Sequence, residues 1–147
     1  MKAKDYLSQV RRFSTSLKQR KLELVDLLDA ATHITQSFNE VRVRYNQNYD
    51  KVADNAVKMA DLENRIQNDM VDLFVRRYEV TCKIQQLQNY LHIEILYKHY
   101  IEFKDFQEIA DELDLTYQYA VEIHGKAIKE FEKLHKNFLN EEKGRTS

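Results

Sequence analysis

The chain has 147 residues, with no Pro, two Gly, no Trp and a formal net charge of −1. So few turn-forming residues exclude a fold built on β-hairpins or α/β loops, and they predict an all-α protein. Charged residues make up 32% of the chain. No apolar run approaches the roughly 18–20 residues that a bilayer requires, so no membrane association is expected.

Two long helices are predicted for the first two thirds of the chain. Within residues 6–45 and again within 52–91, apolar residues recur at alternating steps of four and three. A 3.5-residue repeat held over about five heptads is typical of a coiled coil. The positions of the second seam are Val52, Ala56, Met59, Glu63, Ile66, Met70, Leu73, Arg77, Val80, Ile84, Leu87 and Leu91.

The polar segment 45–50 separates the two predicted helices. Its Asn and Asp residues compete with helical hydrogen bonds, which predicts a turn there and looser backbone anywhere between Thr35 and Asp54. The simplest product is a long antiparallel, coiled-coil-like helical hairpin over residues 1–90. The seams could instead meet in another subunit, and a homodimer through this arm is compatible with either arrangement. We expect the polar seam residues Arg20, Glu63 and Arg77 to set the register of pairing.

A short helical domain is predicted for residues 91–139, followed by a flexible polar tail over 140–147. Asp105 is expected to cap a first short helix, and Thr116 a second. The break 114–116 between them is tight and polar, with Leu115 expected as its one buried anchor. We expect Ile109, Leu113, Leu115 and Ile123 to pack together. An apolar stripe is predicted on each helix, at Phe106, Ile109, Ala110 and Leu113 on the first and at Ala120, Ile123, Ala127, Ile128 and Phe131 on the second. This layout is that of a helix-turn-helix, a motif that presents its second helix to a groove.

The charge is distributed unevenly along the chain. Residues 1–50 carry nine Lys and Arg against six Asp and Glu, whereas residues 91–147 carry eight against twelve. An acidic C-terminal half weakens the case for DNA as a partner, because affinity for nucleic acid depends on neutralising phosphates.

The segments EIADELDLT (108–116) and KAIKEFEKL (126–134), together with Ile123, resemble the fourth region of bacterial sigma factors. The wider order of ILYKHYIE, FQEIADEL and EIHGKAIKEF is similar to small proteins of Gram-positive phages and prophages with sigma-like C-termini, including regulators of the ArpU type. This second resemblance extends over nearly the whole chain, although its N-terminal part depends on periodicity alone.

The resemblance implies a transcription regulator in the cytoplasm of a bacterial host, with RNA polymerase as a further partner. The DNA-binding positions that it implies are Thr116, Tyr117, Gln118, Val121, Glu122, Lys126 and Lys129. The base-reading positions among them are Tyr117, Gln118, Val121 and Glu122. None of these four is basic, whereas sigma factors commonly place Arg at some of these positions. The alternative hypothesis is therefore a protein-interaction module that docks on RNA polymerase or another regulator without reading DNA.

Other site chemistry receives little support from the sequence. No histidine pair has the i, i+4 spacing that lets two imidazoles share one metal ion, and Cys82 is the only cysteine. No glycine-rich phosphate loop is present. We expect no metal, no cofactor and no enzymatic activity. The basic cluster 18–21 is interpreted as a solvated helix face.

Overall fold

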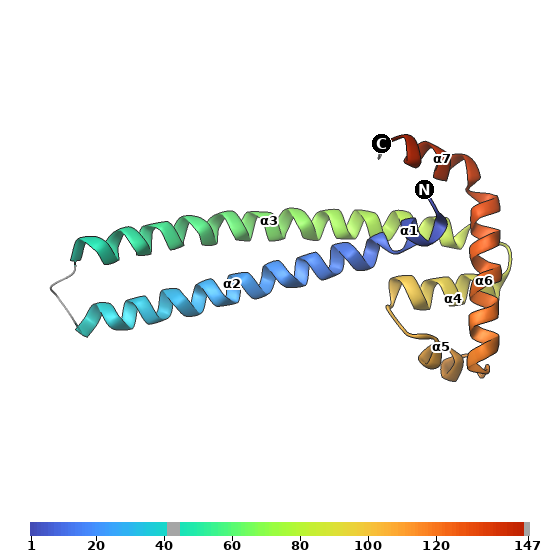
Figure 1. The fold of residues 1–147 in the computed structure, drawn as a ribbon, viewed down its shortest axis with the longest axis horizontal. Helices are drawn as coiled ribbons and strands as arrows, with labels where there is room; N and C mark the ends of the chain where they lie inside the picture. The colour runs from blue at the N-terminus through green and yellow to red at the C-terminus, as the bar shows by residue number, and fades with distance from the viewer. Residues whose placement is uncertain (41–44, 146–147) are drawn as a thin grey trace. The chain divides into compact units, whose positions relative to one another are not determined.

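The computed structural model describes the backbone of residues 1–40 and 45–145, and the side chains of residues 1–32 and 50–145. Every regular element in this part of the chain is helical, which confirms the all-α class. In chain order the elements are α1 (Ala3–Leu7), α2 (Gln9–Glu40), α3 (Tyr45–Gln85), α4 (Tyr90–Leu96), the π-helix η1 (Tyr97–Ile101), α5 (Phe106–Glu112), α6 (Tyr117–Leu134) and α7 (Lys136–Arg145) (Figure 1). None of the described helices is long and apolar enough to cross a membrane.

The chain packs as two compact units, which are described separately. Unit 1 comprises Met1–Phe13 and Leu73–Ser147, and unit 2 comprises Ser14–Asp72. These boundaries differ from the predicted divisions at residues 90 and 139. The difference arises because α1 and the last turns of α3 bury their apolar residues in the same core as α6.

Unit 1 is built around α6. Its main core contains Tyr6 and Leu7 from α1, Ile84 from α3, and Phe131 from α6, all of them fully buried. The Tyr6 ring stacks on Phe131 at 6.1 Å and meets Phe138 of α7 edge-on at 5.1 Å. The residues predicted to face inward from α6 are all buried, which confirms that pattern: Ala120, Ile123, Ala127, Ile128 and Phe131.

Unit 2 contains the middle of α2 and of α3, which lie alongside each other within this unit (Figure 1). Leu17, Leu62 and Ile66 are buried there. An ion pair between Arg20 and Asp69 joins the two helices. Arg20 therefore has a polar partner on the neighbouring helix, as expected of a polar residue that fixes register.

The predicted second seam is wrong at Val52 and Ala56, which are exposed, and further along the helix at every second seam position within residues 63–77. Leu62 is 8% exposed whereas Glu63 is exposed, and Met70 is 49% exposed whereas Asp69 is half-buried. The true seam thus lies one residue earlier at these positions, although it coincides with the prediction at Ile66. A repeat with steps of four and three can place either of two adjacent residues, such as Asp69 or Met70, at every second seam position. In the structure Asp69 occupies the seam, where it pairs with Arg20.

The same shift continues in the part of α3 that belongs to unit 1. Arg76 is half-buried, with its guanidinium 5.6 Å from the centre of the Phe13 ring, whereas Arg77 is exposed. Glu63 and Arg77 therefore do not occupy the seam, and the prediction that they set register is wrong.

Two further backbone predictions also differ from the structure. The segment 45–50, predicted to be a turn, forms the start of α3, and residues 35–40 are helical in α2. The remaining candidates for the turn, residues 41–44, lie outside the described part of the chain. In the predicted tail, residues 140–145 are helical in α7.

Candidate nucleic-acid interface on α5 and α6

The start of α5 is fixed by a reciprocal capping box. The backbone N–H of Glu108 donates to Asp105 Oδ1 at 2.9 Å, and the backbone N–H of Asp105 donates to Glu108 Oε2 at 3.0 Å. Two N–H groups that would otherwise lack partners are thereby satisfied. The predicted cap at Asp105 is confirmed, and two of the acidic residues of this region are committed to local hydrogen bonds.

A tight turn connects α5 to α6. Asp114 adopts φ of 54°, in the left-handed region that Asp tolerates better than most side chains. The N–H of Leu115 then donates to the carbonyl of Ala110 at 2.8 Å, the long-range bond of a Schellman motif. Thr116 begins the next helix, because its Oγ1 accepts from the N–H of Tyr119 at 3.2 Å. The predicted cap at Thr116 is therefore confirmed.

A small apolar cluster holds α5 against α6. Ile109 and Ile123 are buried together with Ile95 of α4, and Leu113 packs on this cluster while remaining half-buried. Leu115 is also only half-buried. The predicted packing of Ile109, Leu113 and Ile123 is thus confirmed, whereas Leu115 is a less complete anchor than expected.

A buried hydrogen bond joins η1 to the inner side of α6. The hydroxyl of Tyr100 and Nε2 of His124 are 2.9 Å apart, and His99 and Phe106 place their rings around His124 at 5.3 and 4.9 Å. Burial, with smaller contributions from His99 and Lys4, lowers the pKa of His124 to about 4. The imidazole is therefore neutral near pH 7, as this apolar setting requires.

The outer surface of α6 carries the candidate DNA-binding residues. The structure leaves all seven exposed: Thr116, Tyr117, Gln118, Val121, Glu122, Lys126 and Lys129. Residues 118, 122, 126 and 129 follow one another at steps of four and three, so they share one side of the helix. Four of the seven predicted residues thus share one exposed side of α6, whereas Thr116, Tyr117 and Val121 are exposed around its first turns.

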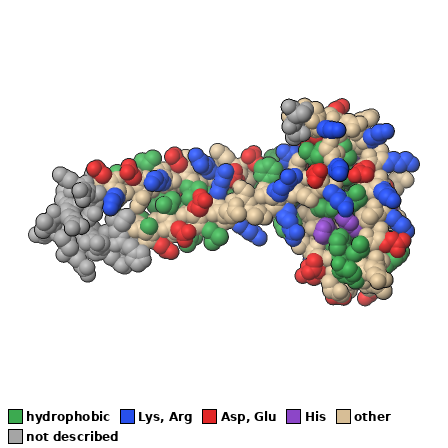
Figure 2. All heavy atoms as spheres, in the orientation of Figure 1, with side chains coloured by type: hydrophobic (Ala, Val, Ile, Leu, Met, Phe, Trp, Pro, Cys, Tyr) green, Lys and Arg blue, Asp and Glu red, His purple; other side chains and the backbone are tan. Residues whose placement is uncertain are grey.

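The charge on this surface is mixed. Lys126 pairs with Glu122 at 3.0 Å, and this contact raises the pKa of Lys126. The first turns of α6 expose Tyr117, Tyr119 and Val121 instead of basic residues. In Figure 2, Lys and Arg side chains on unit 1 are interspersed with Asp and Glu and with apolar side chains, so the visible face has no uninterrupted basic area.

Two lysines compensate part of the acidic charge on α5. Glu112 accepts from Lys98 at 2.7 Å and from Lys104 at 2.5 Å. These hydrogen bonds, that from Lys104 first, lower the pKa of Glu112. No local sequence pattern predicts this network, because Lys98 and Lys104 are fourteen and eight residues from Glu112 and belong to different elements.

The N-terminal segment supplies further positive charge to unit 1. With Met1–Phe13 included, the unit has fifteen Lys and Arg against fourteen Asp and Glu. α1 packs on α6. The guanidinium of Arg11 donates to the carbonyl of Phe103 at 3.3 Å and lies 5.6 Å from the centre of that ring. The acidic C-terminal half predicted from the linear sequence is therefore close to neutral as a folded unit.

The described residues provide no obvious metal site, since no three His, Cys, Asp or Glu side chains gather as they would around an ion. His92 pairs with Glu130 instead. Comparison of the chain with protein-family models, curated proteins and solved structures finds no significant match.

Proposed function

We propose that this protein is a transcription regulator of the phage or prophage type, which binds DNA through a sigma-like helix-turn-helix formed by α5 and α6. In this proposal α2 and α3 form an antiparallel helical hairpin, which serves as an arm and as a surface for homodimerisation. The activity is regulatory rather than enzymatic, and it is exerted in the bacterial cytoplasm.

One observation carries the proposal. Gln118, Val121 and Glu122 are exposed together within the first two turns of α6, directly after the Thr116 cap and above a buried core. Recognition helices present the same part of the helix to base edges. Gln suits adenine, Val suits the thymine methyl group, and Glu suits the cytosine amino group. Lys129, further along the helix, is placed to reach a phosphate.

The test is a fluorescence anisotropy titration of the full chain against promoter duplexes from host and prophage, over a series of salt concentrations. Two to four phosphate contacts imply a log–log salt slope of roughly −2 to −4. Lys129→Ala should weaken binding to all sequences alike and reduce that slope by about 1. Lys58→Ala, which removes an exposed lysine from unit 2, is the matched control and should leave the slope unchanged.

Base reading is tested separately. Gln118→Ala should relax the preference at a single base pair by about 1–3 kcal/mol while leaving the salt slope unchanged. Glu122→Gln should relax the preference for cytosine at its own base pair, whereas binding to other sequences should tighten because Lys126 loses its ion pair and a negative charge is removed. If no saturable binding appears below about micromolar concentrations, direct DNA reading by this protein is refuted.

A second candidate function is docking of the same helix on a protein such as RNA polymerase. It is favoured by the exposure of Tyr117 (51%), Tyr119 (43%) and Val121 (39%), because aromatic side chains are enriched at protein interfaces. Docking of this kind predicts that Tyr117→Ala weakens capture of the polymerase, whereas Lys129→Ala does not. If Lys129→Ala abolished capture of the polymerase and Tyr117→Ala did not, docking through the exposed aromatic and apolar side chains of α6 would be contradicted.

A further inference from the structure

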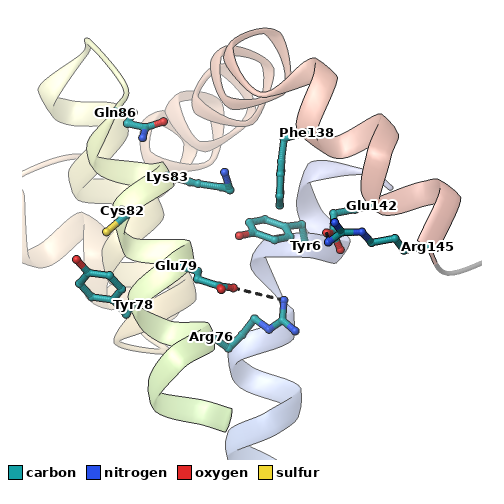
Figure 3. Close-up of a pocket in the computed structure, with 10 residues that line it drawn as sticks. All are labelled: Tyr6, Arg76, Tyr78, Glu79, Cys82, Lys83, Gln86, Phe138, Glu142 and Arg145. Carbon is teal, nitrogen blue, oxygen red and sulfur yellow. Dashed lines mark hydrogen bonds and ion pairs between the residues drawn. The ribbon is translucent and has the colours of Figure 1, made fainter. Parts of the chain in front are cut away.

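A cavity of about 500 Å³ lies within unit 1, among residues of α1, α3 and α7. Figure 3 shows Tyr6 of α1 between the two longer helices, with Glu79 and Lys83 on α3 and Phe138 on α7. The volume is in the range of roughly 300–1,000 Å³ that is usual for small-molecule sites. None of the exposed residues of α6 discussed above lines this cavity, so a ligand bound here would be independent of the proposed DNA contacts.

The Tyr6 hydroxyl is the unusual group in the cavity. The side chain is fully buried, and its oxygen has no hydrogen-bond partner among the described residues. Figure 3 shows this oxygen directed towards α3, where Glu79 and Lys83 lie. Burial raises the pKa of Tyr6 to about 12, so the hydroxyl keeps its proton and can donate it in a hydrogen bond. Buried hydroxyl groups nearly always have a partner, and an acceptor is what this one lacks.

The charges around the cavity leave one cation uncompensated. Arg76 is 3.7 Å from Glu79, and Arg145 is 3.2 Å from Glu142, so each guanidinium has a carboxylate beside it. Lys83 has none within 4 Å among the described residues. Its ammonium group lies 3.7 Å from the centre of the Phe138 ring instead. The local excess is therefore a single positive charge, next to a hydroxyl that requires an acceptor.

We propose that this cavity binds a small organic monocarboxylate. The Tyr6 hydroxyl donates to one carboxylate oxygen, and the Lys83 ammonium turns from the Phe138 ring to pair with the other. The flexible stem of Lys83 permits this movement and opens access to the hydroxyl. The ring of Phe138, which lies against Tyr6, contacts the apolar body of the ligand. A monoanion fits better than a dianion such as phosphate, because only one cation lacks a carboxylate.

The test is isothermal titration calorimetry on the full chain, with benzoate as the probe. Benzamide has the same shape without the charge, and inorganic phosphate represents the dianion. We expect saturable benzoate binding with a Kd below about 1 mM. Benzamide and phosphate should each bind at least about tenfold more weakly, since charge-assisted hydrogen bonds to a carboxylate are lost or mismatched.

Two variants test the assigned groups. Tyr6→Phe removes only the hydroxyl and keeps the ring that packs on Phe131, so the variant should melt no lower than the parent protein. Lys83→Met removes only the charge. Each should weaken benzoate binding by about tenfold or more. The matched control is Lys133→Met on the exposed surface of α6, which should bind benzoate like the parent protein.

Three results would overturn the proposal. One is the absence of saturable benzoate binding. Another is binding that neither Tyr6→Phe nor Lys83→Met reduces, since the ligand would then lie elsewhere. The third is tighter binding of phosphate than of benzoate, which would show that the cavity does not select a monocarboxylate.

Discussion

Acidification should destabilise unit 1 through His124. The imidazole is 7% exposed, and its pKa is lowered from 6.5 to about 4, chiefly by burial. When the pH falls below 6.5, His124 of the unfolded chain takes up a proton that the folded chain does not bind. The stability that the folded protein gains by keeping His124 neutral is therefore fully present above pH 6.5 and is lost as the pH falls towards 4. The linkage relation gives a loss of about 2 kcal/mol at about pH 5. Burial also lowers the pKa values of His99 and His135, so they act in the same direction.

The measurement is urea unfolding followed by circular dichroism, near neutral pH and at about pH 5. His124→Gln keeps a side chain that can hydrogen-bond to the Tyr100 hydroxyl but cannot titrate. We expect the variant to be less stable than the parent near neutral pH, and its pH-dependent loss to be smaller by about 2 kcal/mol. An equal loss in both proteins would refute the assignment of this pH dependence to His124.

Three further predictions concern stability. Leu62→Ala should lower the free energy of unfolding by about 2–4 kcal/mol, whereas Glu63→Ala should change it by less than about 0.5 kcal/mol. A larger loss in urea unfolding for Glu63→Ala than for Leu62→Ala would instead support the predicted seam. Ile109→Ala should cost about 2–5 kcal/mol in the same assay, because the side chain is fully buried between α5 and α6. Thr116→Ala should cost about 1 kcal/mol and increase hydrogen exchange in the first turn of α6, and unchanged exchange there would contradict its role as the cap.

Local features of this fold could be predicted from the sequence. The caps at Asp105 and Thr116 depend on residues within three positions, and the inward stripe of α6 follows from helical periodicity alone. The register of α3 could not be fixed in the same way. Glu63 and Leu62 are adjacent, and the choice between their positions depends on the contact of Asp69 with Arg20, which are 49 residues apart.

The cavity and the mixed charge of the candidate interface had no local signal. Tyr6 and Phe138 are in contact although 132 positions separate them in the chain. Glu112 receives its lysines from η1 and from the segment before α5. Side chains that meet only through tertiary packing leave no periodic pattern, so the pairing of α1 with α7 and the compensation of the acids on α5 were not predictable from spacing.

The position of α1 also changes how the DNA-binding proposal has to be tested. A fragment limited to residues 91–147 would contain the candidate DNA-binding residues, yet it would lack Tyr6, Leu7 and Ile84, which are fully buried in the core that supports α6. Such a fragment would expose that core to water and would also lose the positive charges of residues 1–13. Weak DNA binding by the fragment would therefore follow from either loss and would say little about α6 itself. Only the full chain, with Lys129→Ala compared against Lys58→Ala, separates the contribution of the helix surface from that of the fold beneath it.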